Sequence, residues 1–150
     1  MGTKGVGSLG LALAVVAVDQ ATKLWVAGTL ALGASRPIWE PVLALTRVHN
    51  RGAAFGLFPE QTWAFALVSA VVVGFLTGVL VAERWSAPLL RVGGALLLGG
   101  AIGNLVDRLR WGYVLDFVEI RGFPVFNVAD AGIVVGAALI VVSFLLGRTR

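Results

Sequence analysis

Four long apolar stretches dominate the sequence and restrict the folds that this chain can adopt. They cover roughly residues 8–28, 62–82, 88–106 and 127–146. A helix of about 20 mostly apolar residues crosses the hydrocarbon layer of a bilayer, so each stretch is long enough to span it. Only 13% of the residues are charged, whereas soluble domains carry about 25%. We therefore predict an all-α membrane protein in which residues 1–150 form a single integral membrane domain with four transmembrane helices.

The first apolar stretch imitates a secretory signal peptide, because Lys4 precedes it. The stretch leads into Asp19, Gln20 and Lys23, however, and not into a small-residue cleavage site. We interpret it as an uncleaved first membrane helix.

Four crossings place both chain termini on the same side of the membrane. Of the 12 Lys and Arg residues, five lie on that side and seven on the other, but the terminal-side segments are much shorter. Their higher density of positive charge predicts that the termini lie in the cytoplasm. The opposite end of the bundle would then be extracytoplasmic.

Glycines at four-residue spacing occur in three of the apolar stretches. Such pairs let helix backbones approach closely in lipid, although glycine is also simply common in membrane helices. The pairs predict a tightly packed bundle, and they are Gly74 and Gly78, Gly99 and Gly103, and Gly132 and Gly136.

The longest connection, residues 29–61, predicts a small β-like platform on the extracytoplasmic side. Its segment "VLALTRV" is β-prone and "NRG" is a turn signal. We expect residues 42–58, with Asn50 among them, to lie over the functional groups at that end of the bundle. The alternative is an ordinary surface loop. Aromatic side chains favour the membrane interface, where we expect Trp25, Trp39 and Trp63.

Composition excludes several kinds of chemistry. The chain has no cysteine, so disulfides, thiolate nucleophiles and Cys-ligated metals are excluded. The only histidine, His49, is one too few for a His-Glu-x-x-His zinc site. Ser–His49 and Ser8–Lys4 pairs are poor nucleophile candidates, because no serine is near His49 in the sequence and Lys4 lies at the terminal end. We expect no metal and no cofactor.

Polar residues inside or beside the spans gather toward one end of the predicted bundle. Such residues are expensive in a membrane and are therefore functional candidates. Asp19 and Lys23 are four residues apart and can pair, either to lower the cost of insertion or to brace a catalytic group. Asn127 and Asp130 have the spacing of a helix cap, which does not exclude a chemical role. Arg108 would reach a lipid headgroup or a substrate backbone.

Asp116 stands out because "GYVLDFVEI" surrounds it with apolar residues. An apolar setting raises the pKa of a carboxyl group, and a second acid close by would make the two share one proton. If Asp130 lay close to Asp116, the pair could work as an aspartic protease does, with one acid activating water and the other bonding the scissile carbonyl. The residues alone leave Asp107 and Asp116 as alternatives for this role.

Four blocks in this sequence resemble those of the lipoprotein signal peptidase (signal peptidase II) family. They are "VDQATK", "NRGAAFGLF", "GGAIGNLVDRLRWGYVLDF" and "FPVFNVADAG", in the order of the family and across residues 18–132. The resemblance implies an aspartic endopeptidase of the bacterial inner membrane. This enzyme removes the signal peptide of prolipoproteins that carry a diacylglyceryl group on the lipobox cysteine.

The resemblance also implies roles for particular residues. Asp116 and Asp130 match the catalytic aspartates, and this match favours Asp116 over Asp107. The remaining matches are Asn50, Asn104, Arg108 and Asn127 as substrate-binding residues, and Asp19, Lys23, Asp107 and Gly52 as supporting residues. Only thirteen residues separate the two catalytic aspartates, a short connection for this family. A lid would therefore come from the 29–61 loop.

Two other classes of protein explain part of the sequence, but neither explains all of its features. A small proton- or ion-coupled transporter would bind near the membrane midplane and need access from both sides, whereas the polar groups here crowd one end. A non-catalytic assembly subunit would explain the glycine pairs but not the carboxylates. We expect lipidated prolipoproteins and membrane lipids as partners, no nucleic acid, and a monomer.

Overall fold

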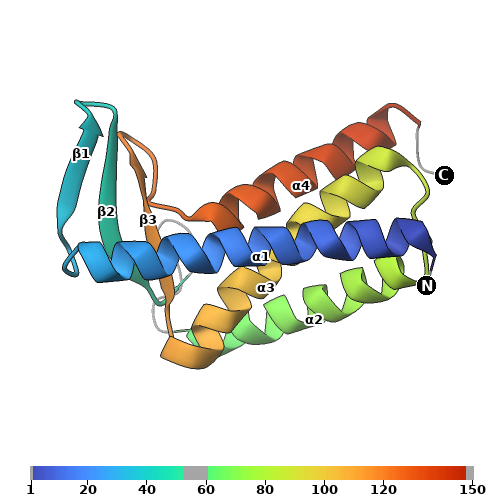
Figure 1. The fold of residues 1–150 in the computed structure, drawn as a ribbon, viewed down its shortest axis with the longest axis horizontal. Coiled ribbons are helices and arrows are strands. Elements are labelled where there is room, and N and C mark those ends of the chain that lie inside the picture. The colour runs from blue at the N-terminus through green and yellow to red at the C-terminus, as the bar shows by residue number, and fades with distance from the viewer. Residues whose placement is uncertain (1, 53–60, 148–150) are drawn as a thin grey trace.

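Four helices form an elongated bundle with a small sheet at one end (Figure 1). This computed structural model describes residues 2–52 and 61–147. The helices are α1 (Thr3–Thr29), α2 (Thr62–Val81), α3 (Pro88–Trp111) and α4 (Val128–Leu145). All four are long and apolar enough to cross a membrane, which confirms the predicted fold class.

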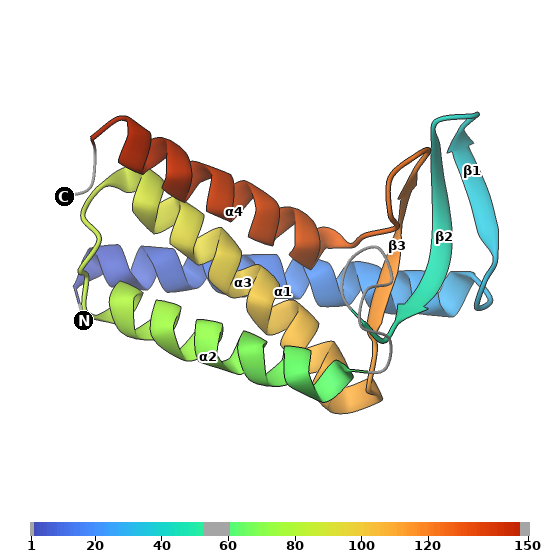
Figure 2. The same cartoon turned by 180° about the vertical axis from the view of Figure 1, so that it is seen from behind.

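Helix α3 is the centre of the bundle, because it contacts α1, α2 and α4 (Figures 1 and 2). It begins at Pro88, as predicted, but continues beyond residue 106 to Trp111. The helix stops where Gly112 adopts a left-handed conformation with φ 72° and its N–H bonds to the carbonyl of Arg108. Glycine tolerates that conformation. The position of Gly112, and not the end of the apolar run, therefore determines where α3 ends.

Helix α1 begins at Thr3, five residues before the predicted start at residue 8. The turn between α2 and α3 supports this extension, because the Glu83 carboxylate accepts the Gly5 N–H at 3.2 Å. A carboxylate beside the first N–H groups of a helix stabilises its positive end.

Two of the three glycine pairs pack as predicted. A Cβ on Gly136 would lie 2.5 Å from the Gly93 carbonyl oxygen, and one on Gly99 would lie 2.6 Å from that of Ala12. The partner glycines Gly103 and Gly132 also face neighbouring helices closely. The prediction is wrong for the pair on α2, where nothing in the described chain lies within 4 Å of a Cβ on Gly74 or Gly78.

The sheet lies at the end of the bundle opposite the termini (Figures 1 and 2). Strands β1 (Ser35–Trp39), β2 (Leu43–Asn50) and β3 (Val114–Ile120) pair antiparallel in the order β1-β2-β3. The first long loop therefore contributes two strands, as the platform predicted. The third strand comes from the connection between α3 and α4, where no strand was predicted.

Two sets of contacts attach the sheet to the bundle. The Arg47 guanidinium on β2 donates to the carbonyl oxygens of Ala27 and Leu30, each at 3.0 Å, at the end of α1. Buried Val26 packs with Leu115 and Phe117 of β3. The Arg47 contacts are favourable because a cation stabilises the carbonyl end of a helix. Together with the apolar packing, they fix the strands against α1.

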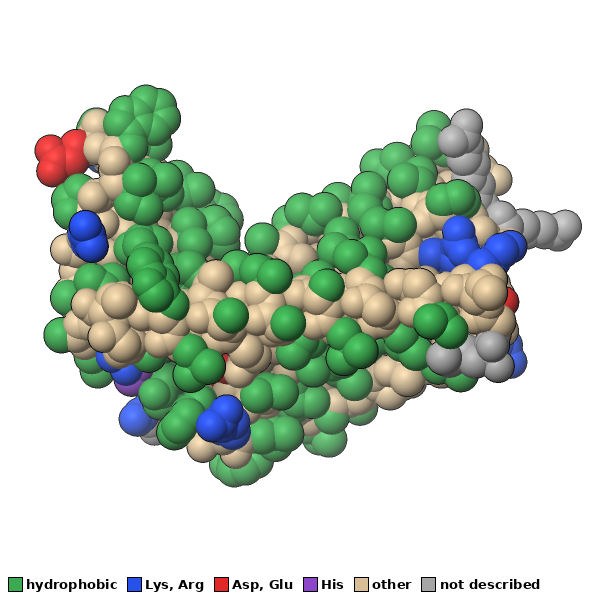
Figure 3. Space-filling view, viewed as in Figure 1, with side chains coloured by type: hydrophobic (Ala, Val, Ile, Leu, Met, Phe, Trp, Pro, Cys, Tyr) green, Lys and Arg blue, Asp and Glu red, His purple; other side chains and the backbone are tan. Residues whose placement is uncertain are grey.

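All four helices carry exposed large apolar side chains, and Figure 3 shows such side chains over much of one face of the bundle. This is the surface expected where lipid replaces water around a bundle. Trp25, Trp39 and Trp63 are exposed. Their position at a membrane interface stays a prediction.

Candidate active site

The start of α4 is closed by the pair of residues that the sequence suggested as a cap. The Asn127 side-chain oxygen accepts the Asp130 N–H at 2.8 Å, and the Asp130 Oδ2 accepts the Asn127 N–H at 3.1 Å. This reciprocal arrangement is a capping box, so the cap interpretation is confirmed. The cap leaves the Asn127 amide nitrogen and the Asp130 Oδ1 available for other partners.

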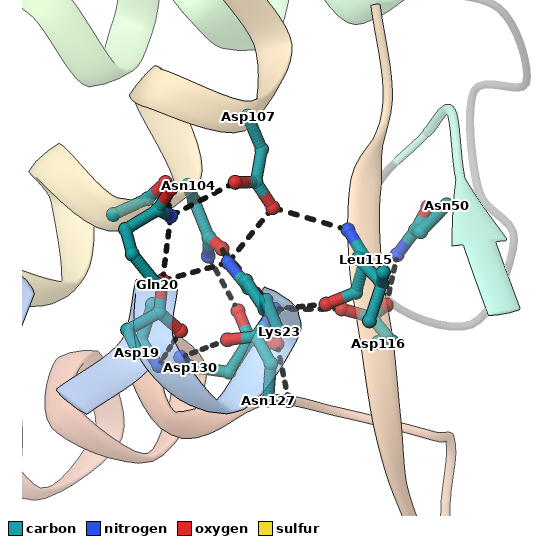
Figure 4. Close-up of polar contacts among 12 residues, drawn as sticks. Asp19, Gln20, Lys23, Asn50, Asn104, Asp107, Leu115, Asp116, Asn127 and Asp130 are labelled. Atoms are coloured by element: carbon teal, nitrogen blue, oxygen red, sulfur yellow. Dashed lines mark hydrogen bonds and ion pairs between the residues drawn. The ribbon is translucent and has the colours of Figure 1, made fainter. Parts of the chain in front are cut away.

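Asn127 uses its free amide nitrogen to reach the second carboxylate. Its Nδ2 donates to Asp116 Oδ1 at 2.7 Å and to Asn104 Oδ1 at 3.1 Å (Figure 4). Asn104 in turn donates to Asp130 Oδ1 at 2.7 Å. Asp116 therefore accepts a hydrogen bond from the Asn127 side chain and Asp130 accepts one from the Asn127 backbone N–H, and the Asn104 amide links Asn127 to Asp130.

Asp116 lies on β3 opposite Val48, and it is only 2% exposed. Its Oδ2 accepts from the Asn50 side chain at 2.9 Å, and the Asn50 oxygen accepts the Gly52 N–H at 3.0 Å. Burial raises the pKa of Asp116 to about 7, and the negative charge of Asp130 adds to this shift. The hydrogen bonds from Asn50 and Asn127 oppose it, because they favour the ionised form.

Both acids line one cavity of about 440 Å³ at the start of α4. Asn50, Gly52, Asn104 and Arg108 share its wall, so six of the ten predicted site residues meet there. The rest of the wall is mainly apolar and comes from the connection between β3 and α4 and from α4 itself. It includes Phe123, Val125, Phe126, Ile133, Val134 and Val135.

Arg108 brings a positive charge to the cavity that contains the two acids. Its guanidinium carbon lies 5.6 Å from the centre of the Phe65 ring, a distance suited to a cation–π contact. The side chain also lines a neighbouring hollow together with Phe65 and Val68. Arg108 therefore connects the polar wall of the site to the gap between α2 and α3.

A buried lysine lies behind the cavity. Lys23 is 4% exposed, and its Nζ lies 2.8 Å from Asp19 Oδ2, 2.9 Å from Asp107 Oδ2 and 3.1 Å from Asn104 Oδ1. Asp19 also accepts the Ala129 N–H of α4 at 2.9 Å, and Asp107 accepts the Leu115 N–H of β3 at 3.1 Å. The pairing of Asp19 with Lys23 is confirmed, and it is part of a larger ionic network that joins α1, α3, β3 and α4.

The same network separates Asp107 from Asp116. The Asp107 carboxylate bonds to Lys23, to the Leu115 N–H and to Gln20. Among the described residues, those that line the cavity include Asp116 and Asp130 but not Asp107. The geometry therefore favours Asp116 as the partner of Asp130.

Sequence reasoning missed Gln20 as a site residue. Its amide nitrogen donates to Asp107 at 2.9 Å, to Asp19 at 3.1 Å and to the Gly103 carbonyl at 3.3 Å. Its position three residues before Lys23 on one helix places both side chains on the same face, and this spacing could have identified it. The apolar part of the cavity wall was also missed.

Two further predictions have different outcomes. His49 stacks on Tyr113 with ring centres 3.7 Å apart, and burial together with Arg47 and Arg51 lowers the pKa of His49. No serine bonds to His49 in the described chain, which argues against a Ser–His pair. Of the predicted cover at residues 42–58, Asn50 and Gly52 line the cavity, whereas residues 53–58 lie outside the described residues.

The described residues also lack a metal-binding cluster, since no three His, Cys, Asp or Glu side chains in residues 2–52 and 61–147 are placed to share an ion.

The fold and the site define a multi-pass membrane protein in which a buried acid, Asp116, and a partly buried acid, Asp130, line one cavity at one end of the bundle. The model of the family "Signal peptidase (SPase) II" matches residues 11–146. The chain therefore belongs to the signal peptidase II family, which makes it a bacterial membrane protease and argues against a transporter.

Individual relatives agree with this assignment. The lipoprotein signal peptidase of Moorella thermoacetica is 45% identical over 139 residues, which cover 91% of each chain. That of Halothermothrix orenii is 43% identical over 129 residues, which cover 86% of this chain and 88% of the relative. A solved bacterial membrane enzyme superposes with a TM-score of 0.86 at 31% identity, over 93% of this chain and 87% of its own.

Replacement of Lys23 by Met should destabilise the protein strongly. The change leaves Asp19 and Asp107 buried without their shared cation, and loss of one partner from a buried ion pair costs about 3–5 kcal/mol. The measurement is the thermal unfolding midpoint in detergent, and Lys4→Met is the control because Lys4 is an exposed lysine on the same helix. Equal midpoints for the two variants would contradict a structural role for the network.

Proposed function

We propose that this chain is an aspartic endopeptidase that removes the signal peptide from prolipoproteins carrying a diacylglyceryl group on the lipobox cysteine. The observation that carries the proposal is the position of Asp116 and Asp130, which line one cavity and are both bonded to Asn127. Membership of the signal peptidase II family agrees with it. The apolar wall of the same cavity suits a substrate with acyl chains.

In this mechanism the two acids share one proton. Asp116 is the protonated member below about pH 7, because its site is buried and Asp130 is close. The carboxylate of Asp130 takes a proton from water while the water oxygen adds to the scissile carbonyl carbon. Asp116 gives its hydrogen bond, and then its proton, to the carbonyl oxygen. The resulting gem-diol collapses when the proton held by Asp130 moves to the amide nitrogen and one gem-diol hydroxyl returns its proton to Asp116. The C–N bond breaks, the carbonyl re-forms as a carboxylic acid, and both catalytic acids regain their starting protonation states.

Neighbouring amides would keep the acids in position during these steps. Asn127 bonds both of them, while Asn50 bonds only Asp116 and Asn104 bonds only Asp130. Asn50 and Asn104 would also meet substrate peptide groups, because both line the cavity. Arg108 would bind a substrate carbonyl oxygen or the phosphate of a lipid beside the substrate. Lys23, Asp19 and Asp107 would act as positioning residues, because they hold Asn104, α4 and β3.

The proposed reaction takes place at the extracytoplasmic face of the bacterial inner membrane, with both termini in the cytoplasm. The site lies at the end of the bundle opposite the termini (Figure 1). The denser positive charge of the terminal-side segments favours this orientation. We also propose that the enzyme acts as a monomer, since both acids and all their amide partners come from one chain.

Replacement of either acid by Asn should abolish cleavage without unfolding the protein. Asn preserves size but can neither take up a proton from water nor supply one, and acid–base catalysis contributes about 10²–10⁴-fold. We expect Asp116→Asn and Asp130→Asn each to lose at least that factor in the initial rate on a purified lipidated precursor.

Glu119→Gln is the matched control, because it removes a carboxylate from the same strand at a position outside the cavity. It should retain the rate of the unaltered enzyme, and all variants should keep a cooperative thermal transition. An inactive Asp107→Asn beside a fully active Asp116→Asn would mean that the catalytic acid has been chosen wrongly.

The rate should depend on pH as a bell. Asp116 must hold its proton, so activity should fall as the pH rises through its pKa of about 7. Activity should also fall at low pH, when both acids are protonated. The measurement is the initial rate between pH 4 and 9 with a chelator present, a range that spans both limbs for coupled carboxyls.

Asn50→Leu sharpens this test. Loss of the Asn50 hydrogen bond, which favours the ionised form of Asp116, should move the upper limb to higher pH. A rate that keeps rising through pH 9, or that requires added metal, would rule out a shared-proton pair.

A further inference from the structure

A second hollow lies at the terminal end of the bundle, opposite the site. It is a groove of about 340 Å³ between the first turns of α1 and α3. Its walls include Lys4, Gly7, Ser8 and Leu11 from α1, and Arg91 and Val92 from α3. The proposed peptidase reaction uses none of these residues.

The groove contains two cations without a counter-ion. The two salt bridges of the described chain both belong to Lys23, so neither Lys4 nor Arg91 pairs with an acid there. The Arg91 Nε is buried and has no hydrogen-bond partner in the described chain. Glu83 lies nearby and accepts the Gly5 N–H, but its carboxylate forms no ion pair with Lys4 or Arg91 in the described chain. A buried donor without an acceptor is unfavourable, and an anion in the groove would supply that acceptor.

The shape of the groove suits an acyl chain next to the charges. Gly7 has no side chain, and nothing in the described residues lies within 4 Å of a Cβ built on it. Leu11 lies one turn further along α1 than Gly7 and makes that part of the wall apolar. The groove therefore changes from cationic to apolar in the direction that leads from the end of the bundle into the bilayer.

The length of α1 agrees with a groove that is cationic near the membrane surface and apolar deeper in the bilayer. Helix α1 has 27 residues and is therefore about 40 Å long, longer than the roughly 30 Å hydrocarbon layer. A helix of this length would place Lys4, at its first turn, among the lipid headgroups. Figure 3 shows Lys and Arg side chains gathered at this end of the molecule beside exposed apolar surface.

We infer that this groove binds an anionic glycerophospholipid from the membrane. The lipid phosphate lies between Lys4 and Arg91, where the Arg91 Nε donates to it, and one acyl chain follows the surface past Gly7 to Leu11. A free phosphate would satisfy the two cations but would leave the apolar half of the groove empty. The membrane lipid is the occupant that matches both halves.

Native mass spectrometry of the purified full-length chain in detergent tests this inference. The probes are phosphatidylglycerol, phosphatidylcholine and inorganic phosphate, and the readout is the apparent Kd of the first bound molecule. Phosphatidylglycerol should bind about tenfold or more tightly than phosphatidylcholine, since each basic group near a membrane surface favours anionic lipid. The double variant Lys4→Gln/Arg91→Gln should lose about the same factor.

Gly7→Leu tests the acyl-chain half separately. A leucine there starts from a Cβ with open space within 4 Å and extends into the groove, so phosphatidylglycerol should again bind about tenfold more weakly. Gly10→Leu is its control, because Gly10 has equally open space on α1 but does not line the groove. Arg84→Gln is the control for charge, because Arg84 is exposed and also lies outside the groove. Both controls should bind within about twofold of the unaltered chain.

Three results would overturn the inference. If Arg84→Gln and Lys4→Gln/Arg91→Gln lost equal affinity for phosphatidylglycerol, lipid binding would depend on the overall charge at this end of the bundle and not on the groove. Equal affinity for phosphatidylcholine, or inorganic phosphate that binds as tightly as the lipid, would exclude an anionic lipid site. If the double variant does not fold, Lys4→Gln alone and Gly7→Leu decide, because Lys4 is exposed and Gly7 is unobstructed.

Discussion

The buried ammonium group of Lys23 is the interaction on which the rest of the structure depends. A lysine that is 4% exposed inside a membrane bundle must find compensating charge, and it finds it in Asp19 on its own helix and Asp107 on α3. The same acids also accept backbone N–H groups, Asp19 through Oδ1 from Ala129 on α4 and Asp107 through Oδ2 from Leu115 on β3. Three helices and one strand are thus fixed to one another around a single cation. The two candidate catalytic acids lie on two of those elements, Asp116 on β3 and Asp130 on α4.

The position of the sheet follows from the same constraint. Unpaired backbone cannot face lipid, so a strand carrying Asp116 has to lie at the end of the bundle and pair with other strands. β2 provides that pairing and also brings Asn50 to the Asp116 carboxylate.

At the start of α4, capping and chemistry use different atoms of the same residues. Asn127 caps with its oxygen and holds Asp116 with its nitrogen, and Asp130 caps with Oδ2 while Oδ1 bonds Asn104.

The parts that could be predicted from sequence are those with local causes. The apolar stretches and the Asn127–Asp130 cap each depend on residues within one segment, and both were found. The strand at Val114–Ile120 was missed because its partner on β2 lies more than sixty positions earlier in the chain, and no local pattern reports that pairing. Gln20 was missed because an uncharged amide between two charged residues gives little signal. The choice between Asp107 and Asp116 required either family resemblance or the three-dimensional positions of Lys23 and the cavity.

The central claim is that Asp116 and Asp130 act together on one scissile bond. The most direct test is a crystal structure with a lipidated peptide in which a secondary alcohol replaces the scissile amide as a mimic of the gem-diol. The account predicts that the alcohol oxygen lies between the two carboxylates, which would be roughly 3–5 Å apart, a shared-proton or one-water distance. Carboxylates more than about 8 Å apart, too far for a shared proton or one bridging water, or an alcohol bound away from them, would contradict it.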